Sequence, residues 1–268
     1  MTNRKNWCCA LSVGPQVINS QSLAALAEAG IHEIELSSGR LPPFEGEFNF
    51  VGRAREHAAL AKAAGVNISS IHLPFAPFAE LDPAHRDAEV RKKLIEVQKN
   101  LILAAADAGI GIGVIHPSGE PYTEEERPER LAIACETIAA LTEIAAGAGM
   151  TIALENLPRT CLCRTSDEML YFLDRIPALR ACFDTNHALT EDNVHFIRAV
   201  GDKIVTLHVS DYDFVDEKHW VPGEGQNNWP AILAALEEAG YQGRFLYESK
   251  LPENGYAGLR ANYDALMA

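Results

Sequence analysis

Ionisable side chains stand at the ends of several short apolar runs in this sequence. The last four runs end, one after another, on Glu155, Asp184, His208 and Glu248. Carboxylates that lie close together repel one another unless one of them holds a proton or a cation lies between them. Carboxylate oxygens and an imidazole nitrogen are suitable ligands for Mn²⁺, Mg²⁺, Co²⁺ or Zn²⁺. The pattern therefore predicts a divalent-metal site made by these four residues.

Three earlier runs also end on ionisable residues, and their signal is weaker. These residues are Glu35, His72 and His116. A single histidine in such a place is usually a hydrogen-bonded loop residue, and a single glutamate often pairs with a helix end or a basic group. We expect Glu35 to be a substrate-side or structural group, and the two histidines to face the substrate.

The apolar runs number eight and read as buried strands. We predict strands over Trp7–Val13, Ile31–Leu36, Val66–Ile71, Ile112–Ile115, Thr151–Leu154, Leu179–Phe183, Ile204–Leu207 and Arg244–Tyr247. Helical stretches alternate with them, and five of these stretches end in Ala-Gly, whose glycine accepts the left-handed conformation of a helix end. Alternation predicts parallel pairing, and eight units over ~250 residues predict an α/β fold of the (β/α)₈ TIM-barrel type. The carboxyl ends of all eight strands would then share one mouth.

The composition is that of a globular protein, and we expect a single domain over residues 1–268. There are 37 acidic and 23 basic side chains, which give a formal net charge of −14. A field of this sign repels phosphate backbones and anionic lipids, so it argues against nucleic acid and membranes as partners. No apolar run reaches the ~18 residues of a membrane span, and no signal-peptide pattern follows the N-terminus. We therefore expect a cytoplasmic protein.

Five short motifs contain or adjoin the predicted ligands. They are Leu154-Glu155-Asn156, Phe183-Asp184-Thr185-Asn186-His187, His208-Val209-Ser210-Asp211, His219-Trp220-Val221-Pro222-Gly223-Glu224-Gly225 and Tyr247-Glu248-Ser249. Their order and spacing, over nearly the whole chain, resemble the xylose isomerase-like barrel superfamily. That superfamily contains sugar isomerases, sugar epimerases and apurinic endonucleases of barrel fold. The resemblance implies the same metal quartet.

The resemblance also implies an activity, that of a metal-dependent sugar isomerase or epimerase. Glu155 and Glu248 would exchange a proton with the carbon next to a carbonyl, through a metal-stabilised enediolate. His187 would meet the substrate oxygens, and His219 would line the mouth. Ketose epimerases of this group have an arginine shortly after the strand-seven histidine, and the segment 210–214 has none. Arg159 and Arg164, which follow the fifth predicted strand, are the candidates to bind the sugar in its place.

The same residues leave other activities open. A dehydratase of an inosose-like keto-sugar would use the same intermediate, and a sugar-binding module without turnover would keep the quartet. The endonuclease branch binds three metals, and its extra ligands have counterparts in His72, His116, His187, Glu217 and His219. Five aromatic residues are candidates for an apolar wall against a sugar, namely Trp7, Phe75, Phe78, Tyr212 and Trp220. The expected partner is a small sugar molecule, without a nucleotide cofactor, and a homo-oligomer is compatible with the family.

Overall fold

The structure is a computed structural model that describes residues 3–37 and 49–268 of the chain. Within these residues, one parallel sheet has the strand order β7-β6-β5-β4-β3-β2-β1-β8. The strands are β1 (Cys8–Val13), β2 (Glu33–Ser37), β3 (Asn67–His72), β4 (Ile112–Ile115), β5 (Thr151–Glu155), β6 (Arg180–Asp184), β7 (Ile204–His208) and β8 (Arg244–Tyr247). Each predicted strand overlaps the observed one, with ends that differ by at most two residues.

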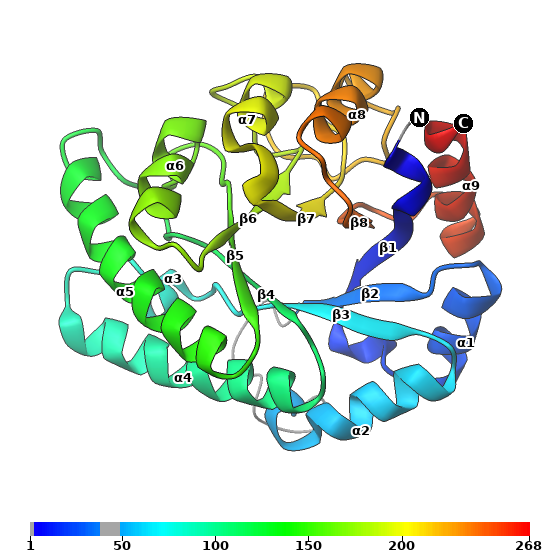
Figure 1. The fold of residues 1–268 in the computed structure, drawn as a ribbon, viewed down its shortest axis with the longest axis horizontal. Helices are drawn as coiled ribbons and strands as arrows, with labels where there is room; N and C mark the ends of the chain where they lie inside the picture. Colours follow the sequence, from blue (N-terminus) through cyan, green and yellow to red (C-terminus); the bar gives the residue numbers. More distant parts are fainter. Residues whose placement is uncertain (1–2, 38–48) are drawn as a thin grey trace.

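Backbone hydrogen bonds join the two outer strands of this order and close the ring. The amide of Val209 donates to the carbonyl of Leu246 at 2.8 Å, and the amide of Glu248 donates to the carbonyl of Val209 at 3.1 Å. Val209 and Tyr247 form a parallel bridge at the same point. The predicted (β/α)₈ barrel is confirmed, with its strands inside and its helices outside (Figure 1).

The main helices follow the strands in alternation. They are α1 (Ser20–Glu28), α2 (Phe50–Ala63), α3 (Phe78–Leu81), α4 (Ala88–Asp107), α5 (Arg127–Gly147), α6 (Ser166–Arg175), α7 (Asn193–Val200), α8 (Trp229–Glu238) and α9 (Gly255–Met267). Side chains such as Asn19 and Asp192 accept hydrogen bonds from amides of the first turn, which satisfies donors that a helix start leaves free. The glycines of the five Ala-Gly pairs have φ between 75° and 85°, as the sequence predicted. No helix in the described part of the chain is long and apolar enough to cross a membrane.

The barrel has an apolar layer outside the sheet and a partly polar interior. Outside, residues such as Leu23, Leu101 and Phe172 are fully buried between helices and strands. A separate small cluster of Val114, Ala153 and Cys182 is also buried. Because side chains alternate along a strand, Ala153 and Glu155 point to the same side of β5. That side is the interior of the barrel, whose polar end is at the mouth.

Trp7 lies at the other end of the barrel. Its indole nitrogen donates to the carbonyl of Tyr241 at 2.7 Å, and the two rings are 5.6 Å apart. Tyr241 precedes β8, so this pair belongs to the amino ends of the strands. The expectation that Trp7 forms part of a wall at the mouth was wrong, because Trp7 comes just before β1 rather than after it.

Candidate functional site

The four predicted ligands lie at adjacent strand ends. Glu155, Asp184 and His208 are the last residues of β5, β6 and β7, and Glu248 directly follows β8. The parallel register places Asp184 opposite His208. One nitrogen or oxygen from each of the four side chains lies within 4.8 Å of the others. Glu155, Asp184 and His208 are buried, whereas Glu248 is half-buried.

His208 contacts carboxylates on both sides of its ring. Its Nδ1 lies 3.0 Å from Oε1 of Glu155 and 3.2 Å from Oε2 of Glu248. Its Nε2 lies 2.9 Å from Oε1 of Glu35. Burial opposes protonation of this ring, but the negative groups around it outweigh burial and raise the pKa of His208 well above its ordinary value. The ring therefore holds a proton readily, or faces a cation in its place.

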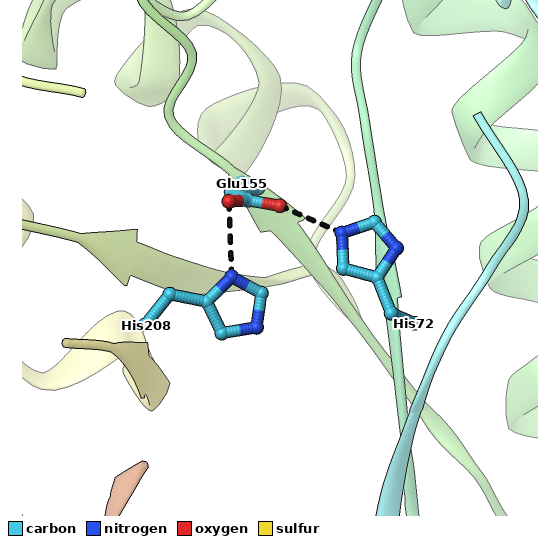
Figure 2. Close-up of side chains that lie close together, drawn as sticks. All are labelled: His72, Glu155 and His208. Carbon is cyan, nitrogen blue, oxygen red and sulfur yellow. Dashed lines mark hydrogen bonds and ion pairs between the residues drawn. The ribbon is translucent and has the colours of Figure 1, made fainter. Parts of the chain in front are cut away.

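The second oxygen of Glu155 faces two more histidines. Figure 2 shows the ring of His72 directed at Glu155. His72 Nε2 lies 3.1 Å from Oε2, and His116 Nε2 lies 3.3 Å from the same atom. His72 uses its Nδ1 to donate to the carbonyl of Leu73 at 2.9 Å, which leaves Nε2 for the carboxylate. Burial lowers the pKa of His116 and is only partly opposed by Glu155. For His72, Glu155 outweighs burial and raises the pKa.

His187 belongs to a second group of ligand-type side chains. Its Nδ1 lies 2.8 Å from the carbonyl of Asn156, and its Nε2 lies 2.7 Å from Oε1 of Glu217. Burial opposes protonation of His187, but Asp184 and Glu217 outweigh burial and raise its pKa to about 10. His187, Glu217 and His219 each have one ligand-type atom within 4.8 Å of the others.

The first group of four has the features expected of a divalent-cation site. Oδ2 of Asp184 is buried and has no hydrogen-bond partner among the described residues, and such atoms are rare unless an ion or water satisfies them. Burial, with help from Glu155 and Glu248 and against the effect of His187, raises the pKa of Asp184 to about 7. A dipositive ion between these side chains would favour every carboxylate in its charged form. The donor set of three carboxylates and one imidazole fits Mn²⁺, Mg²⁺, Co²⁺ or Zn²⁺.

Two members of this group, Glu155 and Glu248, line a cavity of about 220 Å³, whereas Asp184 and His208 are not part of its lining. The predicted site residues that line the cavity are His72, His116, Glu155, Arg159, His187, His219 and Glu248. Phe75 and Phe78 form an apolar part of its wall, as we expected. Tyr212 is fully buried, with its hydroxyl bonded to the carbonyl of Ala188 at 2.8 Å. Glu35 is not part of the lining and lies behind His208.

Comparison with known proteins identifies the family. A family model described as a xylose isomerase-like TIM barrel matches residues 23–266. The chain belongs to this family. An uncharacterized protein of Methanocaldococcus jannaschii is 31% identical over 188 residues, which are 65% of this chain and 63% of that protein.

Two further relatives of this xylose isomerase-like barrel are named for sugar epimerisation. Fructoselysine 3-epimerase of Shigella flexneri is 24% identical over 229 residues, which are 81% of this chain and 80% of that protein. The crystal structure of a D-tagatose 3-epimerase-like protein superposes with a TM-score of 0.79 at 24% identity, over 96% of both chains. The solved structure supports the barrel fold of the family.

Arg159 holds three loops at the mouth of the xylose isomerase-like barrel. Its guanidinium lies 2.6 Å from Glu120 in the β4–α5 loop and 3.0 Å from Asp216 in the β7–α8 loop. It also pairs with Glu217. Glu120 and Glu217 outweigh the effect of burial and raise the pKa of Arg159 above its ordinary value. Arg159 lines the cavity, but much of its hydrogen-bonding capacity is used by the protein itself.

Two acidic residues of the lining were not among the predicted site residues. Glu120 lies five residues beyond β4 and Glu217 lies nine residues beyond β7, so neither ends an apolar run. His187 and Arg159 outweigh the effect of burial on Glu217 and lower its pKa to about 2. The sequence held one indication for Glu217, because it is among the residues that correspond to the extra metal ligands of the endonuclease branch. For Glu120 it held none.

Proposed function

We propose that this protein is a divalent-metal-dependent epimerase or isomerase of a keto-sugar or keto-sugar derivative. The observation that carries the proposal is that Glu155 and Glu248 both line the cavity and both approach the same imidazole nitrogen, Nδ1 of His208. Two carboxylates on either side of a small substrate can serve as base and acid for one carbon. The epimerase names of the relatives support the same class of reaction.

In this proposal Glu155, Asp184, His208 and Glu248 would hold the metal ion. When bound, the ion would polarise the substrate carbonyl and stabilise negative charge on its oxygen. One of the two glutamates takes the proton from the carbon next to that carbonyl. The other glutamate returns a proton to the opposite face, which inverts the carbon. No other atom is gained or lost.

Side chains of the cavity would orient the sugar. His187 and His219 reach the lining from two different loops. His219 uses its Nδ1 on the carbonyl of Glu248, so its Nε2 would bond to a hydroxyl oxygen. His187 would bond to a hydroxyl in place of its contact with Glu217. The rings of Phe75 and Phe78 can cover an apolar face of the sugar and exclude water from the reacting carbon. This arrangement suits a small, hydroxyl-rich molecule.

Solvent exchange at carbon tests the proposal directly. The protein is incubated with Mn²⁺ in deuterium oxide and a panel of ketoses, fructosamine derivatives and inososes, and the products are read by proton NMR. We expect deuterium next to the carbonyl of at least one compound, together with its epimer or isomer. Loss of water from that compound would instead identify a dehydratase. Inversion must disappear in Glu155→Gln and persist in Glu143→Gln, a matched change on the exposed surface of α5. If no compound of the panel exchanges, the proposal fails.

A second candidate function is a multi-metal phosphodiesterase. The observation that favours it is the second ligand-type group of His187, Glu217 and His219 beside the first. Metal content separates the two candidates, since an enzyme of the endonuclease type binds three metal ions per chain. Three equivalents of zinc, with cleavage of a duplex that contains an abasic site, would favour the nuclease. One equivalent of Mn²⁺ without cleavage would favour the epimerase.

A further inference from the structure

Glu35 is a buried acidic residue that the proposed reaction does not use. It lies in the middle of β2 and is fully buried. The register of the sheet places Ser12 of β1 and Ser70 of β3 on either side of it. Glutamate is almost never fully buried unless it is paired. The side chain therefore needs partners inside the barrel, one level below the strand ends.

The partners of Glu35 are groups that can donate hydrogen bonds. Its Oε2 accepts from the hydroxyl of Ser70 at 2.8 Å, and its Oε1 accepts from the hydroxyl of Ser12 at 3.4 Å. Its Oε1 also lies 2.9 Å from Nε2 of His208. An ionised carboxylate only accepts hydrogen bonds, so Nε2 of His208 must hold the hydrogen. In a neutral ring the lone pair is then on Nδ1.

The orientation of that lone pair matters for the proposed metal centre. Nδ1 is the atom of His208 that faces Glu155 and Glu248. The ring of His72 stacks on His208 with centroids 5.5 Å apart and an interplanar angle of 18°, which limits its tilt. Glu35 fixes the rotation and the tautomer of the ring, and His72 fixes its plane.

We propose that Glu35 is a positioning residue of the metal centre, which holds His208 with hydrogen on Nε2 and the Nδ1 lone pair directed at the cation. The inference rests on the metal centre of the proposed function. A carboxylate that accepts from the second ring nitrogen of a ligand histidine orients the ring and makes it a better donor to the metal. Glu35 thus acts through His208 and does not touch the substrate.

The test compares Glu35→Gln with Glu33→Gln in the full chain. Glu33 lies two residues earlier on β2 and pairs with Arg244 at 2.6 Å, so its change removes a charge and an ion pair from the same strand without touching His208. Chelator-treated protein is titrated with Mn²⁺ by calorimetry. We expect Glu35→Gln to raise the Kd about 10–100-fold, the usual effect of losing such a partner. We expect Glu33→Gln to leave the Kd within twofold.

A second readout separates positioning from a role in the fold alone. Nitrogen-15 NMR of the imidazoles, recorded with zinc bound, reports which nitrogen of His208 holds hydrogen. We expect a single Nε2–H form in the unaltered protein. Because the amide of glutamine can either accept or donate, we expect a mixture in Glu35→Gln. A variant with lower thermal stability, an unchanged Kd and an unchanged tautomer would overturn the inference.

Two outcomes need separate treatment. If Glu35→Gln does not fold, Ser70→Ala removes the hydroxyl that orients the carboxylate, and it should weaken Mn²⁺ binding by a few-fold; an unchanged Kd in that variant overturns the inference. If the unaltered protein binds no Mn²⁺ or other divalent ion, the metal centre itself fails. Failure of the exchange test with intact metal binding would reject the proposed reaction and leave the role of Glu35 standing.

Discussion

Glu155 and Glu248 approach the same atom, Nδ1 of His208, from two strands that are not neighbours in the sheet order. Both glutamates line the cavity, but Glu155 comes from β5 and is buried, whereas Glu248 follows β8 and is half-buried. Burial opposes ionisation of Glu248, but His208 outweighs it and lowers the pKa of Glu248 to about 2. The two carboxylates thus share a positive partner but differ in exposure, which suits unequal roles in proton transfer.

We predict that Glu155→Gln and Glu248→Gln each lower the rate of inversion by at least about 100-fold, because an amide cannot take up the proton. Each variant should still exchange deuterium with one of the two epimers, the one whose hydrogen faces the remaining glutamate. The measurement is NMR of both epimers in deuterium oxide, with metal content determined for each variant. Inversion at an undiminished rate in either variant would contradict the two-base scheme.

Arg159 offers a test of how the mouth is held together. We predict that Arg159→Gln raises KM for the substrate found in the exchange panel about tenfold, a loss of about 1.4 kcal/mol. The reason is that Glu120, Asp216 and Glu217 would face one another without their shared cation. Arg164→Gln is the control, since Arg164 belongs to the same loop but pairs with Glu124 at 2.8 Å. Equal KM values for the two variants would show that the contacts of Arg159 do not shape the cavity.

The loop that holds Glu217 and His219 has its own anchor in Asp211. This buried carboxylate accepts hydrogen bonds from the amide of Gly223 at 2.8 Å and from the indole of Trp229 at 2.9 Å. A methyl group at Gly225 would lie 2.4 Å from Oδ1 of Asp211 and 2.4 Å from the carbonyl of Tyr212.

We therefore predict that Gly225→Ala destabilises the protein by about 1–3 kcal/mol, the range for an overpacked site. Gly147→Ala, at the end of α5, meets nothing within 4 Å and should be neutral or slightly stabilising. Chemical denaturation of both variants measures the difference. Equal free energies of unfolding would mean that the loop moves freely to accept the methyl group.

His57 lies on α2, does not line the cavity, and should make the free energy of unfolding depend on pH. Burial, with a smaller contribution from Arg53, lowers the pKa of His57 below its ordinary value of about 6.5. The unfolded chain therefore takes up this proton first as the pH falls, and stability is lost below about pH 6.5. We predict that His57→Phe, whose ring can pack on Phe50, reduces the loss of stability between pH 7 and pH 5. The measurement is chemical denaturation of both proteins at pH 7 and at pH 5. If both lose the same free energy of unfolding between these pH values, the prediction is wrong.

The architecture was predictable because each strand is a separate apolar run with a clear end. The run Ile112–Ile115 matches β4 residue for residue, and Gly65 has the left-handed φ of 77° expected after a helix. Strand ends also indicated which distant residues would meet, since parallel strands in a barrel end at one mouth. The closeness of Asp184 to His208 follows from this rule alone.

Other parts of the site could not be derived from runs and spacing. Glu120 reaches the cavity from an irregular loop, and its partner Arg159 has a left-handed φ of 52° that no local pattern indicates. The depth of Glu35 was also hidden, because β2 continues to Ser37 and leaves Glu35 below the rim. Such positions depend on how loops and strands pack in the folded protein, which no local sequence pattern determines.

The backbone bonds through Val209 join the last strand to its neighbour at the level of the mouth. They hold the main chain of Glu248 against Val209, the residue that follows His208. The contact between β7 and β8 that closes the barrel therefore also brings two of the proposed ligands together. A cation bound there would fasten β7 to β8 through side chains as well as through amides. The amides of Val209 and Glu248 should therefore exchange with deuterium more slowly when the metal is bound. An ion bound for the proposed chemistry would then also stabilise the closed form of the barrel.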